Sequence, residues 1–290
     1  MAAIRAIDQE DVPFRYGLFR GSEKVGQVDL LIEATVPNDA WLGTLPAAEM
    51  FLAGLELPWE EDWLAAGWDL VRGVIAELPS STPAVLQANT NLEQHEHPWR
   101  RVHLFEALGF DLFQEKHGYL WVDRGEPLQV TIPTRTLEEI GDDAYRAIFS
   151  SIPARGLDRN DNYYYSGTGP QNWARVMLTM SSPEDRSSYF IGYEADEPVG
   201  MVGLSAFDEE GTGTISYIGV VPEHRGRGFG RRLLTAATAA ARQRGFHQIL
   251  SDVDVLNLPM RKAMVACGHQ PDLRLWHRWA HWLPVRRSQV

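Results

Sequence analysis

The chain has 290 residues, enough for two domains, and its net charge of −12 falls mostly in residues 1–125, which carry −11, so nucleic acid is not an expected partner. Although 44% of the residues are apolar, the sequence has no run of about 20 consecutive apolar residues that could span a membrane. The acidic N-terminus also lacks the apolar stretch of a secretory signal. We therefore expect a cytoplasmic protein without a membrane partner. Cys267 is the only cysteine, which excludes an intramolecular disulfide and a cysteine-based metal site, and we expect no metal.

The first half of the chain predicts a regular alternation of strands and helices. Strands are expected at 13–21, 26–34, 48–58, 84–90 and 119–123, and helices at 59–78 and 99–110. Gly125 and Pro127 then interrupt two apolar stretches, as a linker does. We therefore expect two domains, at 1–125 and 126–290.

The second half predicts a longer version of the same plan. Single strands are expected at 128–133, 247–257 and 273–283, and three antiparallel strands within 187–221. Helices are expected at 134–152, 171–180, 228–245 and 258–268. Thr136 and Glu139 have the spacing of a capping box at the first helix. The segment 153–170 is expected to be a polar loop. Because both halves share one order of elements, we infer a duplication with an α/β (α+β) fold and a mixed, mostly antiparallel sheet flanked by helices.

The stretch YIGVVPEHRGRGFGRRLL, residues 217–234, joins a strand to an alanine-rich helix. Gly226, Gly228 and Gly230 allow the backbone to approach a ligand closely, and the amides of a helix N-terminus bind anions. Arg225 and Arg227 add charges that can pair with phosphate. Neither the GxxxxGK[ST] pattern of nucleotide-binding loops nor the GxGxxG pattern of dinucleotide sites is present here. The motif thus predicts a phosphate site of another kind.

This stretch resembles the acetyl-CoA motif R/Q-x-x-G-x-G/A of the GNAT N-acetyltransferases, with Arg225, Gly228 and Gly230 in register. The resemblance covers about residues 128–280 and implies acetyl-CoA as the cofactor. In that family the backbone of the fourth strand pairs with the pantetheine arm, and the amides of the following loop hold the pyrophosphate. These roles fall here on Ile218, Gly219 and Val220, and on Arg225, Gly226, Arg227, Gly228, Phe229, Gly230 and Arg231.

A second family signature begins with an asparagine, which is Asn257 in this chain, and we add it to the expected cofactor-binding residues. The tyrosine that often serves as the family's general acid falls at Met264, which cannot donate a proton. The thiolate leaving group has a low pKa and needs no dedicated acid, so this departure does not rule out transfer.

The sequence offers more than one candidate for the base, since an amine attacks only when it is neutral and a nearby group must take its proton. Asp252 lies five residues before Asn257, where a carboxylate is the base in GNATs that resemble the ribosomal-protein N-terminal acetyltransferases. A salt-bridged surface aspartate is the alternative. Tyr217 is a second catalytic candidate, with a packed core tyrosine as its alternative. Asp158, Asp161 and Tyr164 are expected to bind the acceptor, although a solvated loop is equally compatible with their composition.

The first half has no glycine series at the equivalent place. Glu60, Glu61 and Asp62 stand there, and three carboxylates repel phosphate. We expect residues 1–125 to be a degenerate GNAT-like domain without a cofactor and residues 126–290 to transfer acetyl groups to a primary amine of a small polar or cationic molecule. Acetylation of a protein N-terminus and a non-catalytic acetyl-CoA-binding module remain the alternatives. The sequence does not indicate an oligomeric state.

Overall fold

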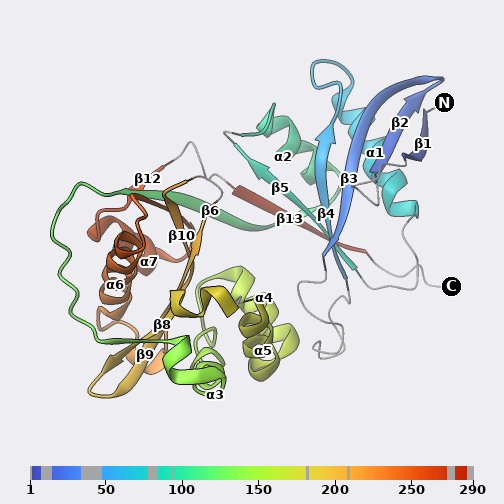
Figure 1. Cartoon of the computed structure of the whole chain (residues 1–290). Coiled ribbons are helices and arrows are strands. Elements are labelled where there is room, and N and C mark those ends of the chain that lie inside the picture. The colour runs from blue at the N-terminus through green and yellow to red at the C-terminus, as the bar shows by residue number, and fades with distance from the viewer. Residues whose placement is uncertain are drawn as a thin grey trace. The chain divides into compact units, whose positions relative to one another are not determined.

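The computed structural model describes residues 2–7, 15–33, 48–77, 84–92, 94–180, 183–207, 210–272 and 278–285 (Figure 1). The chain forms two compact units, each described here by itself. Unit 1 comprises Met1–Glu115 and His277–Val290, and unit 2 comprises Lys116–Trp276. The division therefore falls at Glu115 rather than at the expected linker, and the C-terminal segment belongs with the first unit.

The strands of unit 1 follow the order β1-β2-β3-β4-β5-β13. They are β1 (Ala2–Ile7), β2 (Arg15–Arg20), β3 (Glu23–Glu33), β4 (Ala48–Glu56), β5 (Ala84–Asn91) and β13 (Arg278–Val285), and the helices are α1 (Trp63–Glu77) and α2 (Pro98–Ala107). Neighbours are antiparallel except β4 and β5, which are parallel because α1 carries the chain back to the same end of the sheet. Leu70, Val71 and Val74 form the buried stripe of α1 and pack in one core with Leu104 and Phe105 of α2.

The strands of unit 2 follow the order β6-β11-β10-β9-β8-β7, with β12 also pairing with β6. The first residues of β6, up to Glu115, still belong to unit 1. The elements are β6 (Asp111–Val122), β7 (Thr134–Thr136), α3 (Leu137–Phe149), α4 (Arg159–Thr168), α5 (Pro170–Met180), η2 (Pro183–Ser188), β8 (Tyr189–Glu194), β9 (Glu197–Ala206), β10 (Thr212–Val220), η3 (Pro222–His224), α6 (Phe229–Gln243), β11 (Gln248–Asp254), α7 (Leu258–Ala266) and β12 (Gln270–Pro271). Only β10 and β11 run parallel in this sheet. The expected mixed, mostly antiparallel sheet is confirmed.

Helix α6 holds this sheet through small and branched apolar residues. Leu233, Leu234, Ala237 and Ala241 recur at helical spacing and are fully or almost fully buried in the core of unit 2. The helix ends before Gly245, which takes the left-handed conformation (φ 85°) that terminates many helices, as predicted. The result is a rigid element whose N-terminus stands at the end of β10.

Three expectations about unit 2 are settled by its elements. The capping box is confirmed, since the Glu139 amide donates to Thr136 Oγ1 (3.3 Å) and the Thr136 amide donates to Glu139 Oε2 (2.6 Å). The prediction of a strand at 128–133 is wrong, because these residues form no strand and the next strand, β7, starts at Thr134. The loop expected at 153–170 is also wrong, because it contains α4. Asp158 caps α4 by accepting a hydrogen bond from the Asp161 amide (3.0 Å), so a helix start was encoded in a segment too polar to show periodicity.

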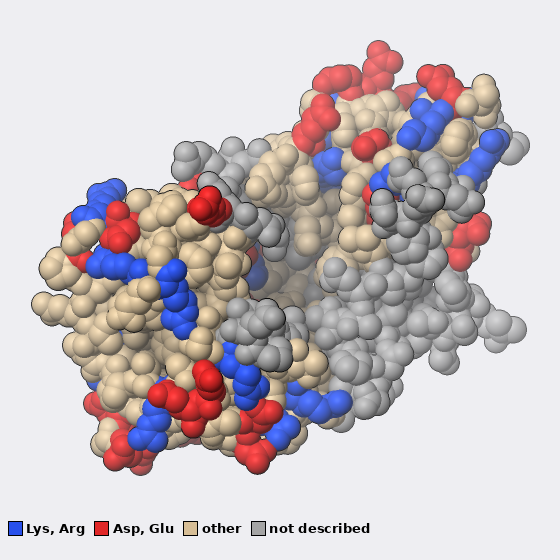
Figure 2. All heavy atoms as spheres, in the orientation of Figure 1, with Lys and Arg blue, Asp and Glu red and all other residues tan. Residues whose placement is uncertain are grey.

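Each unit takes one strand from the other half of the sequence. β6, which follows the last helix of the first half, pairs with β11 from Lys116 to Val122. β13, at the end of the chain, pairs with β5 from Arg278↔Asn91 to Val285↔Ala84. On the face in Figure 2, both signs of charge are interspersed over unit 2, while acidic side chains gather along the upper edge of unit 1. Among the described helices, none is both long and apolar enough to cross a membrane.

Deletion of residues 277–290 tests the strand exchange. Without β13, β5 becomes an edge strand with unpaired backbone groups, and we expect amide exchange along Ala84–Asn91 to quicken by about 10²-fold. Hydrogen exchange with mass spectrometry measures this, and deletion of residues 286–290 alone is the control. Unchanged protection of β5 would contradict the pairing.

Candidate functional site

The site begins where two parallel strands separate. β10 and β11 pair only at Thr212↔Gln248, Gly213↔Ile249 and Thr214↔Leu250, although both strands are described in full and continue beyond these pairs. A bulge between Ile215 and Tyr217 interrupts the pairing of β10 with β9 at the same level. The rest of β10 consequently presents one edge that no strand of the described residues covers.

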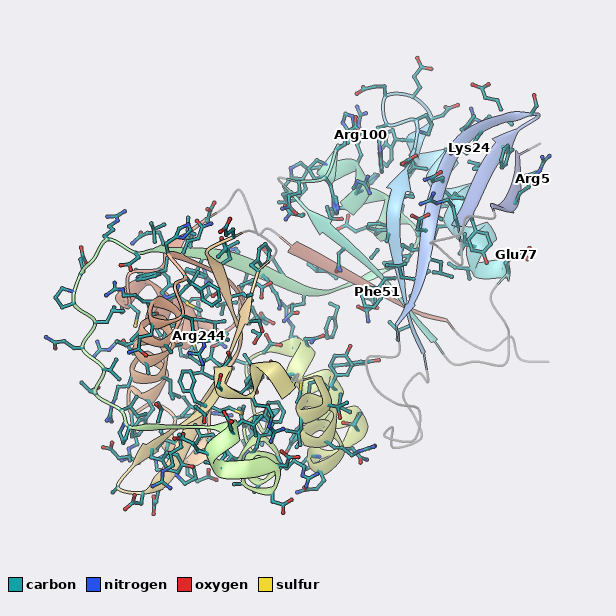
Figure 3. All side chains as sticks on the ribbon, in the orientation of Figure 1. Arg5, Lys24, Phe51, Glu77, Arg100 and Arg244 are labelled. Carbon is teal, nitrogen blue, oxygen red and sulfur yellow. The ribbon has the colours of Figure 1, made fainter. Side chains whose placement is uncertain are left out.

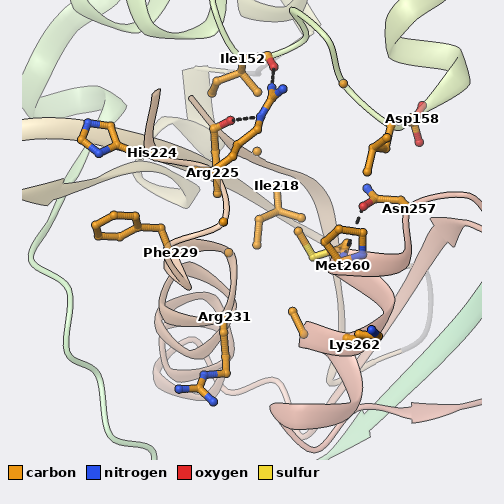
Figure 4. A pocket seen from close by; sticks show the side chains of 18 of the residues that line it. Ile152, Asp158, Ile218, His224, Arg225, Phe229, Arg231, Asn257, Met260 and Lys262 are labelled. Atoms are coloured by element: carbon orange, nitrogen blue, oxygen red, sulfur yellow. Dashed lines mark hydrogen bonds between the residues drawn. The ribbon is translucent and has the colours of Figure 1, made fainter. Parts of the chain in front are cut away.

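A pocket of about 680 Å³ occupies this opening (Figure 4). Three segments of unit 2 line it: the end of β10 with the start of α6, the start of α7, and the turn between α3 and α4. The lining residues used below are Ile152, Asp158, Asp161, Tyr217, Ile218, Gly219, Val220, His224, Arg225, Gly226, Gly228, Phe229, Gly230, Arg231, Asn257 and Lys262. The pocket thus lies entirely within unit 2 and joins the expected cofactor motif to the expected acceptor residues.

The N-terminus of α6 forms an open anion cradle. Gly226 and Gly228 have φ of 75° and 84°, which favours glycine, and a Cβ at either would meet nothing within 4 Å. The first intrahelical bond runs from the Arg232 amide to the Gly228 carbonyl (3.3 Å), so the amides of the first turn need acceptors from outside the helix. Arg231 and Lys262 add positive charge at the lining. This donor set fits a diphosphate.

Arg225 does not belong to that donor set. Its guanidinium donates to the carbonyl oxygens of Val220 (3.0 Å), Ala154 (2.8 Å) and Arg155 (3.0 Å), and also to that of Ile152 (Figure 4). Burial lowers its pKa, as expected for a cation removed from water. The Arg225 side chain, expected to pair with phosphate, instead links the α3–α4 turn to the end of β10 through these hydrogen bonds. We call this set of bonds the Arg225 clasp.

Arg227 also departs from its expected role. Its guanidinium contacts His224 Nδ1 (2.8 Å) and lies 5.2 Å from the ring centre of Phe229, and it is not among the pocket-lining residues. Phe229 itself is buried and anchors the first turn of α6 to the core. Positive charge at the pocket lining near the cradle therefore comes from Arg231 and Lys262, while the side chains of Arg225 and Arg227 are bound elsewhere.

The free edge of β10 carries Ile218, Gly219 and Val220, as the resemblance implied, and all three line the pocket. A Cβ at Gly219 would collide with Ile152, so only glycine fits this close approach. Asn257 lines the pocket too, and its Oδ1 caps α7 by accepting from the Met260 amide (3.3 Å). These residues form the wall on which an extended ligand could pair with backbone groups.

The position of the family's tyrosine faces the core rather than the pocket. Met264 is only 1% exposed and packs in the core cluster of unit 2. His269, at the end of the same signature, is fully buried, and burial lowers its pKa to about 4, so it is neutral. Neither residue can protonate a leaving group in the pocket.

The two predicted catalytic residues lie in different surroundings. Asp252 accepts a hydrogen bond from Lys116 Nζ (2.9 Å) and is not among the lining residues, which is the salt-bridged alternative left open above. Tyr217 lines the pocket, and its hydroxyl donates to Asp161 Oδ2 (3.0 Å). The structure therefore brings Tyr217 together with Asp161, which the sequence suggested only as an acceptor ligand.

The acidity of Asp161 is strongly altered by its surroundings. Burial raises its pKa to about 7, and the nearby Asp158 carboxylate adds to the rise. The Tyr217 hydrogen bond and the positive charge of Lys116 act in the opposite direction. The pKa of Tyr217 is raised well above its ordinary value, by burial first and by Asp161 next, so its hydroxyl keeps its proton.

Of the three expected acceptor residues, Asp158 and Asp161 line the pocket and Tyr164 does not. Tyr164 is 5% exposed and stacks on Trp173 of α5 with ring centres 4.8 Å apart, so it packs α4 against α5. Lys262 and Ile152 were missed, because nothing in their local sequence signals a pocket. The described residues contain no group of three or more potential metal ligands.

The corresponding loop of unit 1 is closed by its own contacts. Between β4 and α1 the Glu61 amide donates to the Pro58 carbonyl (3.0 Å), and Asp62 takes a left-handed φ of 52° where unit 2 has glycine. Arg100, labelled in Figure 3, donates to the Trp59 carbonyl and contacts Glu60 (3.4 Å). Carboxylates and a backbone turn thus stand at this helix start, and the carboxylates would repel a phosphate there.

Comparison with known proteins agrees with this geometry. Residues 158–269 match the model of the acetyltransferase (GNAT) family. A GCN5-related N-acetyltransferase from Sphaerobacter thermophilus is similar over 96% of this chain and 83% of its own, with 16% identity and a TM-score of 0.62. A tandem GNAT protein from the clavulanic acid biosynthesis pathway is similar over 99% and 85%, with 15% identity and a TM-score of 0.52.

A third similar structure is a glucosamine N-acetyltransferase region of a fungal multi-domain GH3 β-N-acetylglucosaminidase, at 14% identity and a TM-score of 0.61, covering 92% of this chain and 33% of that one. The separated parallel strands and the cradle at α6 are thus those of an acetyltransferase fold. Residues 158–269 thus match the acetyltransferase (GNAT) family model, and the whole chain has the fold of GNAT acetyltransferases, including a tandem GNAT protein.

Substitution of Gly228 tests the cradle. Asn and Asp have the same size and both tolerate a left-handed φ, so Gly228→Asn and Gly228→Asp differ mainly in charge. We expect the Asp variant to bind acetyl-CoA about 10- to 100-fold more weakly than the Asn variant, because its carboxylate faces the diphosphate. Calorimetry measures both affinities, and circular dichroism checks folding. Equal affinities would place the diphosphate elsewhere.

Substitution of Arg225 tests the clasp. Arg225→Ala leaves several carbonyls without a donor, and we expect a loss of about 2–3 kcal/mol of unfolding free energy. Arg227→Ala, at the neighbouring exposed arginine, should cost less than about 1 kcal/mol. Urea unfolding measures both. If Arg225→Ala weakened acetyl-CoA binding without changing stability, a phosphate-binding role would replace the clasp.

Proposed function

We propose that unit 2 transfers an acetyl group from acetyl-CoA to a primary amine of a small polar or cationic molecule, by direct attack within a ternary complex. The observation that carries this proposal is one pocket lined both by an anion cradle and by two carboxylates, Asp158 and Asp161. The cradle suits the cofactor's diphosphate, and the carboxylates suit an ammonium group. In this enzyme class the two substrates must meet in one cavity for direct transfer.

In the cofactor half of the pocket, different backbone segments would hold different parts of acetyl-CoA. Acetyl-CoA, when bound, supplies an activated acetyl group as a thioester. The amides between Gly226 and Arg231 would hold its diphosphate, and the free edge of β10 at Ile218 to Val220 would pair with its pantetheine arm. Backbone amides at this edge can also stabilise an oxyanion, since they are fixed before the reaction begins.

The acceptor half is built from the α3–α4 turn and the first turn of α4. Asp158 and Asp161 are the acidic residues among the described lining residues, and they make this end of the pocket attractive to cations. Leu157 lines the same end and adds apolar surface. These features support a small amine with a polar or cationic body over nucleic acid or a membrane as the partner, and we propose that the protein acts in the cytoplasm.

The experiment is a turnover assay with an amine panel and a calorimetric titration. We expect acetyl transfer to at least one small diamine, amino sugar or amino acid, and one acetyl-CoA bound per chain, because unit 1 presents carboxylates at the equivalent loop. Peptides with a free N-terminus form the second arm. Transfer only to the peptides would favour N-terminal acetylation. Tight binding of acetyl-CoA without transfer to any amine would favour a non-catalytic module.

A further inference from the structure

We propose that Asp161, held by the Tyr217 hydroxyl, is the catalytic base that takes the proton from the acceptor amine. This assignment rests on the function proposed above and moves the base from the strand residue Asp252 to the first turn of α4. It assigns Tyr217 the role of a positioning residue.

The position of Asp161 is fixed from two sides. On its own helix, the Asp161 amide donates to the capping carboxylate of Asp158 (3.0 Å), which sets the backbone of the first turn. From the sheet, the Tyr217 hydroxyl donates to Asp161 Oδ2 (3.0 Å). Asp161, Tyr217 and Ile218 line one pocket, so the carboxylate shares that pocket with the strand edge on which the pantetheine arm is proposed to run. A base is useful only within reach of the reacting nitrogen, and its place in the same pocket supports this role.

Charged and titratable groups reach the pair from every neighbouring element. Asp158 acts from α4 and raises the proton affinity of Asp161, whereas Lys116 acts from β6 and lowers it. Tyr145 of α3 acts on the Tyr217 side of the pair, and Arg225 also interacts with Tyr217. With burial as the largest influence, the balance places the pKa of Asp161 at about 7. A base with this pKa is half ionised at neutral pH and still strong enough to accept a proton.

The other carboxylates near the pocket, those of Asp158, Asp252 and Asp254, make structural contacts. Asp158 caps α4. Asp254 is fully buried and accepts from the amide, Nε and Nη2 of Arg159, which anchors the start of α4 to β11. Asp252 is paired with Lys116 and lies outside the pocket lining. Asp161 lines the pocket and accepts its hydrogen bond from the Tyr217 hydroxyl, which lines the pocket too.

The proton balance of the step is simple. The acceptor's ammonium group gives one proton to the Asp161 carboxylate, and the freed nitrogen lone pair forms the N–C bond while the C–S bond breaks. The second N–H proton neutralises the departing thiolate, so the products are the amide and the free thiol. Asp161 then releases its proton to water and returns to the carboxylate. Tyr217 keeps its proton throughout, because its pKa is raised.

The experiment compares Asp161→Asn, Tyr217→Phe and Asp252→Asn, with the exposed Asp143→Asn as the matched control. We expect Asp161→Asn to lower kcat by about 10²–10⁴-fold and to flatten the acidic limb near pH 7, while acetyl-CoA affinity stays within about threefold. In Tyr217→Phe the limb should move to higher pH, because loss of the hydroxyl donor raises the proton affinity of the carboxylate. Asp143→Asn should match the wild type.

Two readouts do not depend on turnover. Infrared difference spectra should show a protonated carboxyl band that titrates near pH 7 in the wild type and is absent in Asp161→Asn. A carboxyl group whose folded pKa is raised to about 7 destabilises the fold as pH rises from about 4 to 7, because the unfolded chain releases the proton first. The urea midpoint of the wild type should therefore fall across this window relative to that of Asp161→Asn.

The outcomes separate the two proposals. If the wild type acetylates an amine and Asp161→Asn keeps both its rate and its acidic limb, the base assignment is wrong while the function stands. Loss of activity in Asp252→Asn with normal activity in Asp161→Asn would return the base to the strand. If the wild type binds acetyl-CoA and transfers to no amine, the proposed function itself fails.

Discussion

The separation of β10 from β11 is the constraint on which the rest of unit 2 depends. Two parallel strands that part after three residue pairs leave one backbone edge without a partner, and buried N–H and C=O groups must bond to something. A ligand with its own amides satisfies this requirement, which is why the opening suits an extended, amide-containing arm. The glycine at 219 and the cradle at α6 add to an edge that is already available.

Two arginine side chains hold the segment that carries Asp158 and Asp161 in place. Arg225 ties the α3–α4 turn to β10, and Arg159 ties the start of α4 to the buried carboxylate of Asp254. Buried ion pairs contribute little net stability, but losing one partner is costly, so such pairs fix position more than they add free energy. Together they hold the first turn of α4 beside the strand edge. Tyr164, stacked on Trp173, supports the same helix from the core.

Sequence reasoning predicted the glycine loop and the strand edge that line the pocket because their signals are local. The glycines and the helix that follows are neighbours in the chain, and the backbone conformation they permit is a local property. It did not foresee the contacts of the Arg225 side chain, because the partners of a guanidinium come from a distant segment, here 152–155. It considered Asp161 only as an acceptor ligand for the same reason, since burial and the contact with Tyr217 arise only in the folded chain. The helix α4 was missed, since its residues lack a clear apolar period and only its cap marked it.

The exchanged strands make the two units dependent on each other during synthesis. The partner of β5 in unit 1 is β13, which follows the whole of unit 2 in the sequence. Unit 1 therefore cannot complete its sheet until the chain of unit 2 has been made. The dependence also runs the other way, because the first half supplies β6 to the sheet that holds the pocket. A chain without the first half would leave β11 without this neighbour.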